Sequence, residues 1–340
     1  MEQNILHLHP GLIWFFGATI FIMLLLDLGV FHKKSHVVST REAIVWSGVW
    51  ISLAMIFSGV ICWVFSQDNG GTALAVEKFT QFQAAYWIEK ALSVDNLFVF
   101  ILVFSYFKVP RELHHRVLFW GILGALVFRA IFIFAGVGLI NITYLNPLLD
   151  LLGAKPLAWN INLVLTAFGL FLVYAGIKSW GKGEEEEEAD FSSSAGSRLV
   201  HRLYKVSDHY DRGKFFTVQN GIKVATPLLV VLGVIEFTDV LFAVDSIPAI
   251  FAISKDPFIL YTSNIFAILG LRSLYFLLSN FIHMFSKLPY GLSIILTFIG
   301  IKMIISPWFH IPSPVSLGVV VGVLLLSVLV SLVFREREVV

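Results

Sequence analysis

The sequence predicts an all-α polytopic membrane protein, and three observations lead to that class. Hydrophobic residues make up 57% of the 340 residues and charged residues only 14%. The mean hydropathy is +0.83, whereas soluble globular chains are closer to half apolar and a quarter charged. The apolar residues fall into about nine segments of roughly 20 residues, the length that an α-helix needs to cross a bilayer.

The nine predicted transmembrane helices follow one another along the whole chain. They cover residues 12–31, 43–65, 84–106, 115–138, 159–178, 226–252, 258–280, 290–306 and 313–334. The first is expected to be retained, because no Lys or Arg precedes it and no small-residue cleavage motif follows it. Five regions result: N-terminal helices in 1–83, a first transmembrane repeat in 84–178, a cytoplasmic loop in 179–225, a second transmembrane repeat in 226–306, and a C-terminal helix and tail in 307–340.

The positive charges of the loops predict the orientation. Lys and Arg gather in alternate connections, namely 32–41, 108–116, 179–225, the segment around Lys287 and the tail after residue 334, while 66–83, 139–158 and 253–257 are poorer in charge. Lys and Arg favour the cytoplasmic side of a membrane. The N-terminus is therefore predicted outside and the C-terminus in the cytoplasm.

The 179–225 loop is the one sizeable predicted segment between helices. Its run Glu184–Glu188 favours a solvated flexible linker, with an acidic cation-sensing segment as the alternative. Asn220-Gly221 predicts a tight turn and a small hairpin. Pro227 is expected to open the next helix, where its missing N–H costs nothing.

The composition excludes several classes of protein. Cys62 is the single cysteine, so neither an intrachain disulfide nor a cysteine-based metal site is expected. A net charge of +1 and the lack of a basic domain argue against nucleic acid as a partner. The sequence has no His-Glu-x-x-His and no Gly-x-Gly-Asp, so we do not expect an enzyme or a bound cofactor.

Two acidic motifs inside predicted spans define the candidate site. They are Glu89-Lys-Ala-Leu-Ser-Val-Asp95-Asn96 and Asp239-Val-Leu-Phe-Ala-Val-Asp245-Ser246. Each reads acid, five residues, acid, then a small polar residue, and Glu236 lies one helical turn before the second motif. A carboxylate near the bilayer midplane costs about 3 kcal/mol or more. A bound cation would explain why the chain keeps several of them.

The two motifs predict an inverted repeat. When Asp95 is aligned with Asp245, Glu89 falls opposite Asp239, and each motif helix is followed by a helix with a central arginine, Arg129 or Arg272. In the predicted topology the first motif helix runs from outside to inside and the second from inside to outside. Repeats of this kind, here of three helices each, often place a transport site at their interface.

The residue types limit the cargo to hard cations. Carboxylate, amide and hydroxyl oxygens suit Mg²⁺, Ca²⁺ and Mn²⁺ better than Cu⁺ or Zn²⁺. The candidate metal ligands are Asp27, Glu89, Asp95, Asn96, Glu236, Asp239, Asp245 and Ser246. Asp27 is either a ligand or an acid that snorkels to the inner surface, and Asn264 is a similar case. In the alternative interpretation the acids only form ion pairs with Lys90, Arg129, Arg272 and Lys302.

These motifs, with Thr262-Ser-Asn-Ile-Phe-Ala-Ile-Leu-Gly-Leu-Arg, resemble the TerC family of integral membrane proteins and its Alx-like branch of manganese exporters. The resemblance runs from about residue 12 to 334. It implies a LysE-like helical fold and Mn²⁺ efflux across a bacterial inner membrane. It also implies acidic site residues at Asp27, Glu89, Asp95, Glu236, Asp239 and Asp245.

Two classes of function stay open at this point. The preferred one is a transporter that exports Mn²⁺, either in exchange for protons or down the gradient of the metal. The other is a membrane interaction protein, associated with tellurite resistance by the family name, that assists insertion or metal loading of other proteins. The expected partners are the divalent metal ion and the lipid bilayer, and whether the protein forms a homo-oligomer is left open.

Overall fold

The computed structural model describes residues 10–31, 39–68, 71–151, 155, 159, 161–181, 191–219, 221–281 and 288–333. Within these ranges the side chains of residues 27–31, 94, 95, 98, 148, 151, 179, 181, 244, 245, 280, 281 and 288 lie outside the description. The described chain forms a bundle of α-helices and one two-stranded hairpin.

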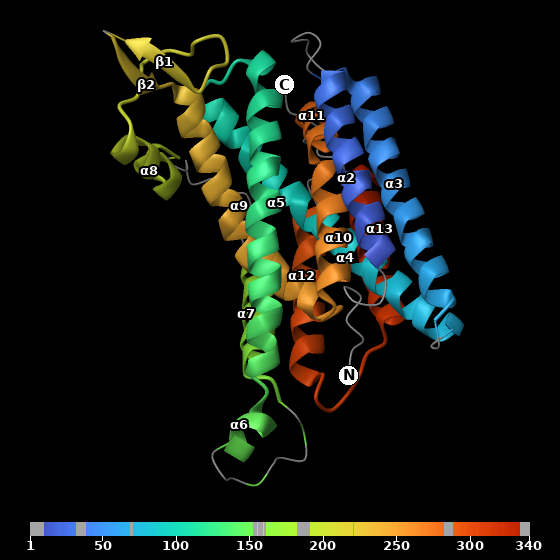
Figure 1. The fold of residues 1–340 in the computed structure, drawn as a ribbon. Helices are drawn as coiled ribbons and strands as arrows, with labels where there is room; N and C mark the ends of the chain where they lie inside the picture. The colour runs from blue at the N-terminus through green and yellow to red at the C-terminus, as the bar shows by residue number, and fades with distance from the viewer. Residues whose placement is uncertain are drawn as a thin grey trace.

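The helices run side by side along one direction of the bundle (Figure 1). In chain order the helices are α2 (Pro10–Phe31), α3 (Thr40–Ser66), α4 (Gly71–Tyr106), α5 (Arg111–Ile142), α6 (Leu145–Leu151), α7 (Leu163–Gly181), α8 (Ala195–Leu203), α9 (Pro227–Phe251), α10 (Pro257–Leu269), α11 (Leu271–Phe281), α12 (Leu288–Ile305) and α13 (Ser313–Val333), of which the short α6 and α8 lie at the ends of the bundle. A 3₁₀ turn covers Phe191–Ser193, and the hairpin pairs β1 (Phe216–Gln219) with β2 (Ile222–Ala225). The hairpin and α8 lie at one end of the bundle and α6 at the other.

The all-α, multi-pass class is confirmed, while the number of spans stays a prediction. Each of the nine predicted ranges falls on a helix or, for 258–280, on the pair α10 and α11. Among the described residues, four helices (α3, α5, α9 and α13) are long and apolar enough to cross a membrane. The pair α10 and α11, bent by 40°, adds a fifth if it is one span, and α2, α7 and α12 contain shorter apolar helices.

The prediction of a loop at 66–83 was wrong for most of its length. Helix α4 begins at Gly71 and runs for 36 residues, about 54 Å, so it also crosses the predicted domain boundary at residue 83. Its first turns are polar and therefore escape a search for apolar segments, but they are rich in good helix formers. Lys78, Gln81 and Gln83 there are buried against other parts of the protein.

The hairpin and the start of α9 form as predicted. Phe216 pairs with Ala225 and Gln219 with Ile222, and Gly221 in the turn has a positive φ of 77°. Pro227 occupies the first turn of α9. Pro248 lies inside α9, and the helix continues past it to Phe251.

Helix α4 is the centre of the bundle. It packs against α3, α9, α10 and α13, while α5 packs against both α9 and α10. Helices α7 and α12 pack very closely at two glycines, Gly169 and Gly300. A Cβ at Gly300 would lie only 2.6 Å from the backbone oxygen of Gly169. The helices that carry the two acidic motifs, α4 and α9, are therefore in direct contact.

Candidate cation-binding site

Arg129 joins the two acidic motifs. Its side chain projects from α5 and forms ion pairs with Glu89 of α4 and with Asp239 of α9. The Arg129 Nη2 atom lies 3.4 Å from Asp239 Oδ1. Arg129 and Glu89 are fully buried and Asp239 is 4% exposed. Glu89 and Asp239, which occupy matching positions in the two motifs, thus meet at the guanidinium group of Arg129.

The three side chains leave hydrogen-bonding capacity unused. Two carboxylates against one guanidinium give this group a net charge of −1 when the acids are ionised. Glu89 Oε2, Asp239 Oδ2 and Arg129 Nε are buried and have no hydrogen-bond partner among the described residues. A buried polar atom without a partner costs about 1–3 kcal/mol. Unpaired carboxylate oxygens of this kind are suited to bind a cation.

Glu236 brings a third carboxylate to the same face of α9. Its Oε2 atom is buried and has no hydrogen-bond partner within the described ranges. The side chain lies against Gly124 of α5, where a Cβ would overlap the carboxylate oxygens of Glu236. The sequence motifs did not point to Gly124, because a glycine in an apolar helix does not reveal which side chain occupies the space beside it.

The two small polar residues of the motifs are also buried. Asn96 is 3% exposed and Ser246 is 2% exposed, and the Ser246 hydroxyl has no partner among the side chains and backbone that the structure describes. The Ser93 hydroxyl donates a hydrogen bond of 3.4 Å to Glu89 Oε1. Ser93 thus places a neutral oxygen beside Glu89, while Asn96 and Ser246 are buried on the two motif helices.

Three predicted ligands lie outside the described side chains. Asp27 belongs to α2, Asp95 to α4 and Asp245 to α9, but their contacts are not among those that the structure describes. Within the described residues, no group of three His, Cys, Asp or Glu side chains is arranged to hold a metal ion. The complete set of predicted ligands stays a prediction.

The lysines proposed as counter-ions do not pair with the acids in the described chain. Lys90 Nζ donates to the backbone oxygen of Ala267 at 3.2 Å. Lys302 Nζ donates to the Ser316 hydroxyl at 2.7 Å. Arg129 is the cation that pairs with Glu89 and Asp239 in that part of the chain. This contact is expected both for a structural ion-pair network and for a cation site.

Two further buried groups lie on the helices around the acids. Asn264 of α10 is fully buried, and neither the oxygen nor the nitrogen of its amide has a hydrogen-bond partner in the described part of the chain. The buried Tyr86 hydroxyl of α4 also has none among the described residues, and the sequence motifs did not point to it. Its spacing was the available signal, because Tyr86 precedes Glu89 by three residues and so shares its helix face.

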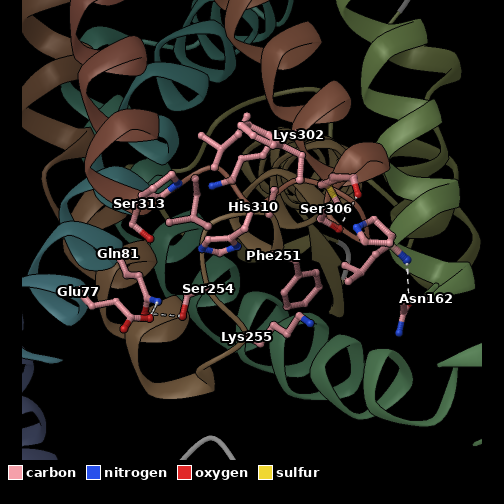
Figure 2. A pocket seen from close by; sticks show the side chains of 18 of the residues that line it. Glu77, Gln81, Asn162, Phe251, Ser254, Lys255, Lys302, Ser306, His310 and Ser313 are labelled. Carbon is pink, nitrogen blue, oxygen red and sulfur yellow. Dashed lines mark hydrogen bonds between the residues drawn. The ribbon is translucent and has the colours of Figure 1, made fainter. Parts of the chain in front are cut away.

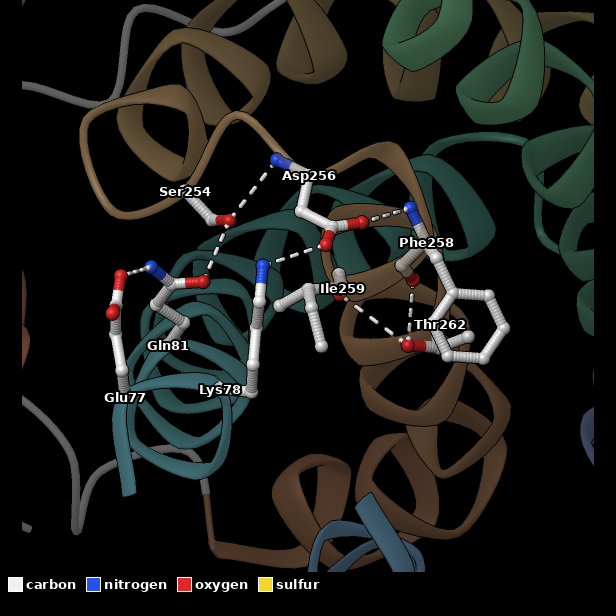
Figure 3. Close-up of polar contacts among 8 residues, drawn as sticks. All are labelled: Glu77, Lys78, Gln81, Ser254, Asp256, Phe258, Ile259 and Thr262. Atoms are coloured by element: carbon white, nitrogen blue, oxygen red, sulfur yellow. Dashed lines mark hydrogen bonds and ion pairs between the residues drawn. The ribbon is translucent and has the colours of Figure 1, made fainter. Parts of the chain in front are cut away.

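A separate ion pair fixes the start of α4 (Figure 3). Lys78 Nζ lies 2.8 Å from Asp256 Oδ2, and both side chains are buried. The other Asp256 oxygen accepts a hydrogen bond from the backbone N–H of Phe258 and caps α10. The Ser254 hydroxyl donates to Gln81 Oε1 at 2.9 Å. These contacts bind the segment between α9 and α10 to α4.

The helices and the buried acids define a multi-pass integral membrane protein with a charged centre. The model for the "Integral membrane protein TerC family" matches residues 74–339. The chain belongs to this family, as its sequence motifs indicated.

Curated relatives match almost the whole chain. An uncharacterized membrane protein of Myxococcus xanthus is 44% identical over 324 residues, which is 95% of this chain and 92% of the relative. A protein of Escherichia coli strain K12 that carries the name membrane-bound redox modulator Alx is 42% identical over 317 residues, 93% of this chain and 92% of the relative. An uncharacterized membrane protein of Rickettsia bellii is 37% identical over 321 residues, 94% of this chain and 97% of the relative. No solved structure matches.

Proposed function

We propose that this protein is a transporter that exports divalent cations, with Mn²⁺ as the main cargo, across the inner membrane of a bacterium. The observation that carries the proposal is the pairing of Glu89 and Asp239 on one buried arginine, where one carboxylate oxygen of each has no partner in the described part of the chain. Ionisable residues inside a membrane bundle usually mark the path of an ion. Together with Glu236, these acids offer only hard oxygen ligands, which suit Mn²⁺.

The arrangement of α4 and α9 supports an inverted repeat. Lys78 of α4 pairs with Asp256 beyond the end of α9, and Glu89, further along α4, shares Arg129 with Asp239, further back along α9. The two motif helices therefore run in opposite directions (Figure 1). Helix α4 packs on α10 as α9 packs on α5, and α7 packs on α12. A two-fold axis in the membrane plane that relates α4, α5 and α7 to α9, α10–α11 and α12 would produce this pattern.

In the proposed mechanism the cation competes with Arg129 for the carboxylates. A divalent ion that enters between α4 and α9 binds the unpaired oxygens of Glu89 and Asp239 and offsets their charge. Tilting of one repeat against the other then exposes the ion on the outer side. The N-terminus lies outside and the C-terminus in the cytoplasm, as the distribution of Lys and Arg predicts.

Several relatives carry a name that refers to redox modulation. Cys62 is the single cysteine of this chain, so one chain has no dithiol pair with which to exchange disulfides. We therefore favour metal transport over thiol chemistry. A role in the insertion or metal loading of other proteins remains the alternative.

Transport into proteoliposomes tests the proposal. Wild-type protein should move Mn²⁺ across the bilayer, and Asp239→Asn should abolish this movement because Asn keeps the shape and removes the charge. Asp208→Asn, which changes an exposed acid of the cytoplasmic loop, serves as the matched control. Wild-type rates in a folded Asp239→Asn protein, or no Mn²⁺ movement by the wild type, would refute the proposal.

A further inference from the structure

A cavity lined by both polar and apolar side chains lies at the end of the bundle opposite the hairpin. Its walls come from the first turns of α4, α7 and α13 and from the last turns of α9 and α12. Its volume is about 530 Å³, within the range of ordinary ligand pockets. Figure 2 shows Lys302, Ser313 and His310 in the upper part of this cavity and Lys255 in the lower part.

The cavity is separate from the acidic cluster. Phe251, which lines the cavity, follows Asp239 on α9 by twelve residues, or about 18 Å of helix rise. The residues that line the cavity include none of the predicted cation ligands. A ligand of this cavity would therefore be different from the transported cation.

Cationic groups outnumber acidic groups among the described residues that line the cavity. Lys255 and Lys302 contribute two ammonium groups, whereas Glu77 is the one carboxylate. Glu77 is exposed, and its Oε1 atom accepts a hydrogen bond from Gln81 at 2.9 Å. The wall thus carries a net positive charge.

Lys302 is buried without a carboxylate partner in the described chain. It is 6% exposed, and its ammonium group donates to the Ser316 hydroxyl at 2.7 Å. Lys255 is half-buried, and its ammonium group contacts the Tyr144 hydroxyl and lies 4.9 Å from the centre of that ring. An ammonium group held away from water is unfavourable unless an anion or water accompanies it.

Asp256 is the described acid nearest to Lys255 in the sequence, but it does not pair with that lysine. It follows Lys255 directly, but one of its oxygens pairs with Lys78 and the other caps α10 (Figure 3). Among the described residues the buried ammonium group of Lys302 likewise has no anionic partner, and the cavity that Lys302 lines has room for one.

We propose that this cavity binds a phosphate group, with Lys302 as its main cationic contact and Lys255 as a second positive charge on the wall. Lysine is a common phosphate ligand, because its ammonium group acts as a point charge with three donors. Phe251, Met303 and Phe309 supply apolar surface for an attached organic part. The phosphate has two potential sources, a soluble phosphate compound or the headgroup of an anionic lipid at the membrane surface.

Binding measurements on the purified full-length protein test this proposal and separate the two sources. Equilibrium dialysis with radioactive inorganic phosphate measures the soluble source. Native mass spectrometry of protein from nanodiscs that contain phosphatidylglycerol or phosphatidylcholine measures the lipid source. The wild type should bind phosphate or retain phosphatidylglycerol, and Lys302→Met should weaken that binding at least tenfold. Lys302→Arg, which keeps the charge, should restore much of it.

Lys223→Met, on the exposed face of β2, is the matched control and should bind as the wild type does. If Lys302→Met fails to fold, Lys255→Met and His310→Asn carry the test. Absence of binding to both phosphate and phosphatidylglycerol in the wild type would overturn the proposal. Equal binding by a Lys255→Met/Lys302→Met double variant, or tighter binding of succinate than of phosphate, would overturn it as well. The Mn²⁺ assay is independent of these outcomes.

Discussion

Replacing Arg129 with Gln is expected to destabilise the protein and to make its stability depend on divalent cations. Arg129 is fully buried and pairs with Glu89 and Asp239, which are 0% and 4% exposed. Removing one partner of a buried ion pair costs about 3–5 kcal/mol, because the remaining charge is left uncompensated. Two carboxylates remain here, so we expect the loss of unfolding free energy to lie at the upper end of that range.

The measurement is thermal unfolding of purified Arg129→Gln protein at increasing Mn²⁺ concentration. A ligand at 100 times its dissociation constant adds about 2.7 kcal/mol of stability. The variant should gain more from Mn²⁺ than the wild type, because no guanidinium group competes for the carboxylates. Arg198→Gln, an exposed change on α8, should behave as the wild type. An Arg129→Gln protein as stable as the wild type without metal, or one that Mn²⁺ does not protect, would refute the reasoning.

Three other changes test separate parts of the structure. Gly124→Ala should slow Mn²⁺ transport in a folded protein, because the new Cβ displaces the carboxylate of Glu236. Gly318→Ala is the control, since a Cβ at Gly318 meets nothing within 4 Å. Equal transport rates in the two variants would count against a role for Glu236. Asp256→Asn should lower the unfolding free energy by about 3–5 kcal/mol through loss of its buried pair with Lys78, and an unchanged melting temperature would contradict this. Val218 is 69% exposed in the hairpin, which is predicted to be cytoplasmic. In a variant without Cys62, Val218→Cys should therefore not react with a membrane-impermeant thiol reagent in intact cells. Ready labelling would contradict the predicted topology.

The sequence predicts the helices best where burial in lipid dictates composition. The apolar segments, the Asn-Gly turn and Pro227 all follow from local chemistry. The first turns of α4 were missed, because Lys78 and its polar neighbours are buried by protein contacts that no local pattern reveals. The break between α10 and α11 was missed for the same reason. It lies at Gly270, where a Cβ would lie only 2.6 Å from Lys90 Nζ of another helix.

The candidate site was predictable in its residue types and only partly in its contacts. The repeated motif placed Glu89 opposite Asp239, and the structure brings both to Arg129. The sequence pointed to a central arginine in each half but could not assign its partners, because these depend on how α4, α5 and α9 pack. The free space beside Gly124 likewise depends on the rotamer of Glu236 on a neighbouring helix.

Direct Mn²⁺ binding to the purified protein tests the central claim, that Glu89 and Asp239 together hold the transported ion. Electron paramagnetic resonance reports free Mn²⁺ and therefore gives the number and affinity of bound ions. We predict saturable binding by the wild type and a loss of affinity of about 100-fold or more in Glu89→Gln/Asp239→Asn, since each charged contact contributes about 1.5–3 kcal/mol. Unchanged Mn²⁺ affinity in that folded double variant would contradict the claim.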